Sequence, residues 1–204
     1  IYNNLSLAVI DEQHKFGVKQ RVEISDKGQN VNVLVMTATP IPRSLALTAY
    51  GDMDISTLTE KPKGRKPIKT YVLSQDKIGD VLNSINRAIK NNALVYWVCP
   101  LIEESENSDL IAVNERFDYL KNYFKNYNIS LVHGKQNQID RENSMNDFKE
   151  GKSKILVATT VIEVGVDIPD ATIIVIECAE RFGLAQIHQL RGRVGRSDKE
   201  SSCI

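Results

Sequence analysis

Short apolar segments alternate with longer amphipathic or polar segments along most of this 204-residue chain. The apolar runs predict strands, which lie at Leu5–Ile10, Val31–Met36, Thr70–Leu73, Ala93–Cys99, Ile129–Val132, Lys154–Ala158 and Ala171–Ile176. Helical spacing predicts helices that end near Tyr50 or cover Lys77–Lys90, Val113–Phe124, Gln138–Lys149 and Leu184–Arg191. This alternation predicts an α/β fold in which helices flank parallel sheets.

The clearest break in the pattern is Lys61–Pro67, where proline and glycine interrupt a run of charge. We therefore expect a linker at 61–68 between two parts, residues 1–60 and 69–204. The chain begins with Ile1 rather than methionine, and a new strand starts just as it stops at Ile204. These ends indicate a piece of a longer protein.

Charge and composition narrow the possible functions. The chain has 26 basic and 26 acidic side chains, so any nucleic-acid binding must come from a local basic surface. The spacing of the three cysteines and three histidines fits neither a metal site nor a disulfide framework, which favours a reducing compartment. We find no signal peptide and no apolar run long enough to span a membrane.

The segment at residues 189–196 reads Gln-Leu-Arg-Gly-Arg-Val-Gly-Arg. Arginine offers a planar fork of donors that suits phosphate, and glycine allows close approach. If residues 185–196 are helical, Gln189, Arg193 and Arg196 share one face. Taken alone, the segment is equally compatible with a solvated basic helix end.

Polar residues also follow the first two predicted strands. Asp11 and Glu12 come directly after Leu5–Ile10, a usual place for carboxylates that hold Mg²⁺ beside a triphosphate and activate water. Thr37 and Thr39 follow the next strand and offer hydroxyls to the first motif. Each motif alone is also compatible with an ordinary solvated turn.

Two further candidates follow strands in the second part. The segment Thr159–Asp167, with Thr160, Glu163 and Gly165, offers hydroxyl and backbone donors to a nucleic-acid phosphate. His133 and Gly134 follow Ile129–Val132 and can meet a backbone phosphate as well. A buried loop and a simple turn are the structural alternatives for these two segments.

A triphosphate cradle of the form G-x-x-x-x-G-K-[ST] is not found in the sequence. Gly151-Lys152-Ser153 matches its end, but Asn146 stands where the first glycine belongs. The segment also joins a helix to a strand, the reverse of the required order. We expect a turn there.

Taken together and in order, these segments resemble the motifs of superfamily 2 helicases. Asp11–His14 resembles motif II, Thr37–Thr39 motif III, Thr159–Asp167 motif V and Gln189–Arg196 motif VI. The amino-acid sequences of four segments are similar to RecG, a family of bacterial ATP-dependent DNA translocases that remodel stalled forks and branched DNA. The segments are Asp11–Val18, Thr37–Arg43, Tyr96–Ser105 and Glu180–Gln186. The resemblance covers essentially the whole chain and implies RecA-like (P-loop NTPase helicase) domains, with part of the first at 1–60 and most of the second at 69–204.

The resemblance also implies roles for the motif residues. Asp11 would coordinate Mg²⁺ bound with ATP, and Glu12 would polarise the attacking water. Arg193 and Arg196 would reach the γ-phosphate, with Gln189 positioning them. Gln13, His14, Thr37 and Thr39 would couple nucleotide state to DNA, while His133, Thr159, Thr160 and Glu163 would contact DNA or couple to it.

The family's phosphate-binding loop and junction-gripping wedge domain would precede Ile1, and its translocation hairpin would follow Ile204. We therefore expect negligible ATPase and no unwinding from the 204-residue chain alone. The parent would be a monomeric motor in the bacterial cytoplasm, acting on branched or forked double-stranded DNA and not on membranes. The alternatives are an inactive nucleic-acid-binding remnant, a piece of the transcription-repair coupling translocase, and an RNA helicase.

Overall fold

The structure is a computed structural model that describes residues 5–11, 31–37, 54–60, 62, 64–100, 106–159 and 168–204, without the side chains of 106–111. The chain divides into two compact units, Ile1–Leu58 and Thr59–Ile204. Each unit has its own sheet and is described separately below.

The described part of the first unit contains two parallel strands, β1 (Leu7–Asp11) and β2 (Asn32–Met36). Their register runs from Leu7 opposite Asn32 to Asp11 opposite Met36. Because side chains alternate along a strand, Leu7, Val9, Leu34 and Met36 share one face, and all four are exposed. Ile10 lies on the other face and is buried.

The second unit is built on a six-stranded sheet in the order β3-β8-β7-β4-β6-β5, and every neighbouring pair is parallel. The strands are β3 (Ile68–Thr70), β4 (Leu94–Val98), β5 (Asn128–Val132), β6 (Ser153–Ala158), β7 (Ala171–Ile176) and β8 (Ser201–Cys203). The central strand β4 is buried along its whole length, as expected when both faces of a parallel sheet are covered.

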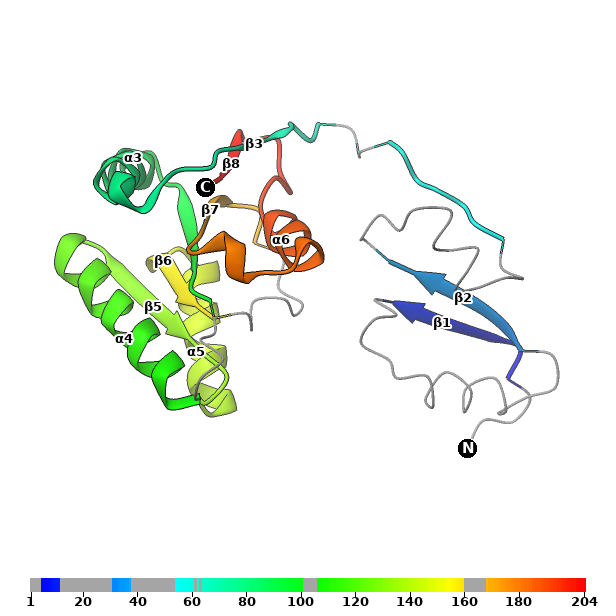
Figure 1. The fold of residues 1–204 in the computed structure, drawn as a ribbon. Coiled ribbons are helices and arrows are strands. Elements are labelled where there is room, and N and C mark those ends of the chain that lie inside the picture. The colour runs from blue at the N-terminus through cyan, green and yellow to red at the C-terminus, as the bar shows by residue number, and fades with distance from the viewer. Residues whose placement is uncertain are drawn as a thin grey trace. The chain divides into compact units, whose positions relative to one another are not determined.

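Helices cover both faces of this sheet (Figure 1). On one face, α3 (Ile78–Lys90) and α4 (Glu106–Tyr123) pack Leu82, Ile85 and Leu120 against Trp97 of β4. On the other face, α5 (Gln138–Lys149) and α6 (Leu184–Arg191) pack Phe148 and Leu190 against Tyr96. Two short 3₁₀ turns, η2 (Gln75–Lys77) and η4 (Ala179–Arg181), lead into α3 and α6.

The predicted parallel α/β architecture is confirmed, and the bounds predicted for α5 and α6 are those observed. The strand predicted at Thr70–Leu73 is wrong: β3 ends at Thr70, and Val72 is 95% exposed. Its partner β8 is short, and the Tyr71 N–H donates to Cys203 O as the last rung between them. Pairing with β8, and not local hydrophobicity, sets the end of β3.

Helix α4 also begins earlier than predicted. Residues 106–112, which precede the predicted helix, form its first turns, and Val113 is only the eighth residue of the helix. The sequence has Glu106 and Asp109 at this point, and acidic residues favour the first turns of a helix because its N-terminal end carries partial positive charge. The helix predicted to end near Tyr50 lies outside the described residues.

Candidate functional site

The arginine-glycine segment follows the C-terminal end of α6. The helix ends at Arg191, and Gly192 caps it by donating its N–H to the carbonyl groups of His188 and Leu190. Val194 is then buried at 2% exposure, and Gly195 takes a left-handed conformation with φ of 73°. The helical face imagined for Gln189, Arg193 and Arg196 is therefore wrong, because the two arginines lie in the loop beyond the helix.

The loop holds its last arginine close to the helix end. The Arg196 Nε–H donates to the Gly192 carbonyl at 2.9 Å, four residues back. Gln189, Arg193 and Arg196 are all half-buried. The hydrogen bond therefore ties Arg196 to the C-terminal cap of α6.

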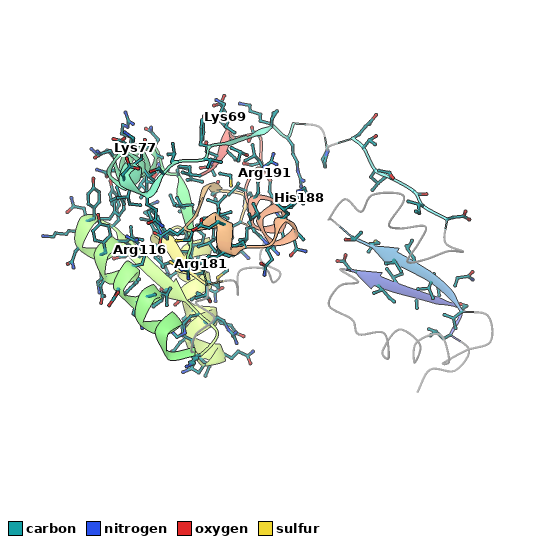
Figure 2. All side chains as sticks on the ribbon, in the orientation of Figure 1. Lys69, Lys77, Arg116, Arg181, His188 and Arg191 are labelled. Carbon is teal, nitrogen blue, oxygen red and sulfur yellow. The ribbon has the colours of Figure 1, made fainter. Side chains whose placement is uncertain are left out.

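The same region is strongly basic although the whole chain is neutral. Residues 181–197 contain Arg181, Arg191, Arg193 and Arg196 and no carboxylate. Figure 2 shows Arg191 and His188 on α6 and Arg181 on the turn before it. A local basic segment of this kind is what binding to a polyanion requires in a chain with zero net charge.

Two other predicted residues lie together at the carboxyl edge of the second sheet. His133 follows β5 and Thr159 follows the adjacent strand β6, and the Thr159 N–H donates to the carbonyl of Val132 at 3.3 Å. Thr159 is only 3% exposed. Parallel strands bring these residues to one edge, the place where such sheets gather ligands.

The His133 turn is clamped by Gln136. The Gln136 side chain accepts from the His133 N–H and donates to the Leu131 carbonyl, both at 3.0 Å. The His133 Nδ1 is buried without a hydrogen-bond partner. Burial, and then the charge of Lys135, lowers the pKa of His133 and favours its neutral imidazole.

In the first unit, Asp11 is the last residue of β1 and Thr37 directly follows β2. The register of the two strands brings them to the same edge. Glu12, Gln13, His14, Thr39, Thr160 and Glu163 lie outside the described residues. Among the residues that are described, no group of His, Cys, Asp and Glu side chains is arranged to hold a metal ion.

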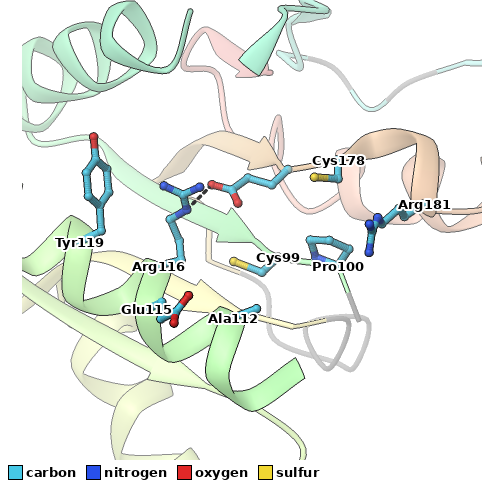
Figure 3. Close-up of a pocket in the computed structure, with 9 residues that line it drawn as sticks. Cys99, Pro100, Ala112, Glu115, Arg116, Tyr119, Cys178 and Arg181 are labelled. Carbon is cyan, nitrogen blue, oxygen red and sulfur yellow. Dashed lines mark ion pairs between the residues drawn. The ribbon is translucent and has the colours of Figure 1, made fainter. Parts of the chain in front are cut away.

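A pocket of about 390 Å³ opens at the carboxyl ends of β4 and β7, beside α4 (Figure 3). Glu177 contacts two partners there through one oxygen: the Trp97 Nε1–H donates to its Oε1 at 2.8 Å, and the Arg116 Nε lies 2.7 Å from the same atom. The Arg116 contact is an ion pair without an aligned N–H···O bond. The Arg116 guanidinium also lies 5.3 Å from the centre of the Tyr119 ring.

This Trp97–Glu177–Arg116 cluster was missed in the sequence. Its signal was present, because Glu177 follows the apolar strand β7 as directly as Asp11 ends β1. Two cysteines line the same pocket. Burial, followed by the charge of Glu177, raises the pKa of the Cys99 thiol, and Cys178 has a left-handed backbone with φ of 48°.

Comparison with known proteins assigns the fold to a family. The conserved C-terminal domain of helicases matches residues 77–198, which is more than half of the chain. The chain belongs to this helicase family. The helicase domain includes His133, Thr159, Gln189, Arg193 and Arg196, and it begins after β3 and ends before β8.

The resemblance to RecG is confirmed over the whole chain. The whole 204-residue chain is 47% identical to the ATP-dependent DNA helicase RecG of Thermotoga maritima and to that of Bacillus subtilis. It covers 26% and 30% of those proteins, so it spans less than a third of their length. The same identity, 47% over 208 residues, relates it to RecG of Escherichia coli K12.

Solved structures agree with this placement. A structure of RecG bound to a three-way DNA junction matches the whole helicase segment with 42% identity and a TM-score of 0.76, and 26% of that chain is covered. Yeast Dbp5, solved with RNA and ADP BeF3, matches with a TM-score of 0.66 at 16% identity. At that identity Dbp5 supports the helicase fold alone. No helix in the described part of the segment is long and apolar enough to cross a bilayer.

Proposed function

We propose that this chain is a motor segment of a RecG-type ATP-dependent DNA helicase that moves on branched or forked double-stranded DNA. The observation that carries the proposal is the 47% identity to RecG over all 204 residues. The proposal assigns the first unit to part of one RecA-like domain, the second to most of the other, and residues 61–68 to the linker. It also gives the parent the role of a monomeric motor in the bacterial cytoplasm.

In this function Arg193 and Arg196 reach the terminal phosphate of ATP. Guanidinium groups suit that role because they are always charged and present paired donors to phosphate oxygens. The basic segment at 181–197 and the anchor from Arg196 to Gly192 support the assignment. Gln189, half-buried in the last turns of α6, helps to position the arginines.

The proposal assigns the metal ion and the attacking water to residues of the first unit. Asp11 would hold Mg²⁺, and Glu12 would orient and polarise the attacking water. The position of Asp11 at a strand end supports this role, because a carboxylate there suits a hard cation. When bound, Mg²⁺ with ATP supplies the charge neutralisation that phosphoryl transfer needs.

The DNA surface lies at the carboxyl edge of the second sheet. His133 contacts the phosphate backbone there, and Thr159, Thr160 and Glu163 belong to the surface that tracks DNA and couples it to the motor. The adjacency of β5 and β6 supports this grouping. With its lowered pKa, His133 acts as a neutral hydrogen-bond donor and not as a cation. Thr37, with Gln13, His14 and Thr39, couples the nucleotide state to DNA binding.

The test uses the full-length protein and measures ATP hydrolysis with forked DNA. Arg193→Ala and Arg196→Ala should each lower kcat by roughly 10³–10⁵-fold, the usual contribution of an arginine finger. Glu12→Gln should abolish turnover. Arg87→Ala is the matched control, since Arg87 is an arginine of α3 bonded to Ser84, and it should leave kcat unchanged. Full activity in both arginine variants would refute the proposal.

Two further measurements separate the alternatives. The 204-residue chain alone should show negligible ATPase, because its sequence contains no G-x-x-x-x-G-K-[ST] cradle. DNA-stimulated hydrolysis by this chain, lost in Glu12→Gln, would contradict that expectation. In a competition experiment, unlabelled forked DNA should displace a fluorescently labelled DNA fork from the full-length protein far better than unlabelled RNA does. Better displacement by RNA would favour an RNA helicase.

A further inference from the structure

The loop that follows α6, residues 192–196, is called the arginine loop below. Ile68, on the first strand of the second unit, lies directly against Gly195 in this loop. A Cβ atom placed on Gly195 would stand 2.7 Å from Ile68 Cγ1 and 3.0 Å from Ile68 Cδ1. Carbon atoms in ordinary contact lie about 3.5–4.0 Å apart, so the site has no room for a methyl group. The φ of 73° at Gly195 adds backbone strain for any other residue, a cost that does not depend on Ile68.

Both sides of this contact are held in place. Ile68 is β-branched, so its χ1 angle is restricted, and it packs on the core cluster that contains Leu190 and Val194. Its strand is paired with β8, with Ile68 opposite Ser201. Val194, next to Gly195, is buried in the same cluster. The loop backbone therefore meets a side chain whose movement is limited by its restricted χ1 angle and by packing on the core.

Gly195 stands between the two arginines that bear the proposed function. The anchor from Arg196 Nε to the Gly192 carbonyl fixes one side of the loop, and the contact of Gly195 with Ile68 fixes the other. The conserved helicase domain matches residues 77–198, so Ile68 lies outside the segment that defines the family.

We infer that Ile68 is a positioning residue for the arginine loop. Contact with its side chain fixes the position of the backbone that carries Arg193 and Arg196. The inference rests on the proposed function of these arginines. Ile68 touches neither nucleotide nor DNA in this role and acts only through Gly195. Because an arginine finger acts on the transition state, a displaced loop should lower kcat and leave the KM for ATP nearly unchanged.

The test places substitutions at both sides of the contact in the full-length protein and follows DNA-stimulated ATP hydrolysis. Gly195→Ala should lower kcat by roughly 10²-fold, the scale expected when catalytic groups move by about 1 Å. Ile68→Ala should lower kcat roughly 10-fold, and Ile68→Val, which keeps Cγ1, by less than about threefold. In all three variants the KM for ATP should change by less than about twofold.

The double variants give the decisive test, because they show whether a smaller side chain at position 68 restores the kcat lost in Gly195→Ala. Adding Ile68→Ala to Gly195→Ala removes both atoms that the new methyl group would meet, so kcat should recover at least about fivefold over the single Gly195→Ala variant. Adding Ile68→Val leaves Cγ1 at its 2.7 Å position, so it should restore much less. A general loss of folding would produce no such difference between the two doubles.

Controls separate positioning from stability. Ile155→Val removes one methylene from a fully buried side chain on the opposite face of the sheet, and Lys69→Ala removes the exposed neighbour of Ile68. Both should leave kcat within about twofold of the parent. Ile68→Ala that melts earlier yet keeps full kcat, or equal rescue by the Ala and Val doubles, would overturn the inference. If Arg193→Ala and Arg196→Ala also keep full kcat, the proposed function fails first, and the two failures are thereby distinguished.

Discussion

Removing the Glu177 carboxylate should destabilise the second unit far more than removing an ordinary surface charge. Its Oε1 atom accepts a hydrogen bond from the Trp97 indole at 2.8 Å and lies 2.7 Å from the Arg116 Nε. Trp97 is fully buried in the core. In Glu177→Ala the indole N–H has no acceptor at that position, and the half-buried guanidinium loses its counter-charge.

The magnitude follows from these two losses. A buried donor left without an acceptor costs about 1–3 kcal/mol, and hydrogen bonds to charged groups lie at the upper end. The ion pair adds less, because the Arg116 and Glu177 side chains keep 30% and 17% exposure and are partly screened by water. We expect Glu177→Ala to cost about 3 kcal/mol, which corresponds to roughly 6–12 °C in Tm for a unit of this size. Glu177→Gln keeps an acceptor oxygen and should cost about 1 kcal/mol.

The assay uses a probe that the chain already contains, because Trp97 is its single tryptophan. Guanidinium unfolding followed by Trp97 fluorescence gives the free energy of unfolding, and circular dichroism serves the Trp97→Phe variants. A double-mutant cycle between Trp97→Phe and Glu177→Ala should show a coupling of at least about 1 kcal/mol. Glu180→Ala, an exposed neighbour, is the control and should stay within about 0.5 kcal/mol of the parent. Additive costs in the cycle, or equal losses in Glu177→Ala and Glu177→Gln, would refute this reasoning.

Three other predictions concern single side chains. Cys178 has a left-handed backbone, as does Asn92 with φ of 62°, and asparagine tolerates that conformation better. Cys178→Asn should therefore raise the free energy of unfolding by up to about 1 kcal/mol, and a loss in urea unfolding would contradict this. Because burial and Lys135 lower the pKa of His133, the unfolded chain binds this proton at a higher pH than the folded chain. Stability should therefore fall as the pH drops below about 6.5, and His133→Gln should remove that part of the pH dependence, as measured by urea midpoints between pH 7.5 and 5. Burial raises the pKa of Cys99 and Cys203, so iodoacetamide at pH 8 should modify Cys178 first, and mass spectrometry of the peptides should show the other two labelled only after denaturant is added.

The fold was largely predictable because its periodic signals are local. Asn137 caps α5 by accepting from the Asp140 N–H, and Gly192 ends α6, so these two helices start and stop where their sequences indicate. The end of β3 was not predictable in that way. Its length depends on pairing with β8, which lies at the far end of the chain in sequence.

The candidate site likewise has features that the local sequence predicts and features that depend on the three-dimensional fold. Arginines in a segment without carboxylates, and a carboxylate at a strand end, can be recognised from residue types because their chemistry belongs to the side chain itself. The Glu177 cluster requires knowledge that β4 and β7 are neighbours, which only the strand order supplies. The helical face expected for Arg193 and Arg196 failed because α6 ends at Arg191, before either arginine, and Gly195 then turns the backbone into a left-handed conformation.

That failure bears on how the arginine loop works. A continuous helix would hold its side chains by its own hydrogen bonds, whereas a loop needs contacts from elsewhere in the fold. Here the contacts are the Gly192 carbonyl and the Ile68 side chain, and Ile68 directly follows the proline- and glycine-containing segment that leads into the second unit. A strand held at that point can fix the arginines only while β3 stays paired with β8. Under the proposed function, the position of the two guanidinium groups would therefore depend on the pairing of β3 with β8 as well as on the motif that contains the arginines.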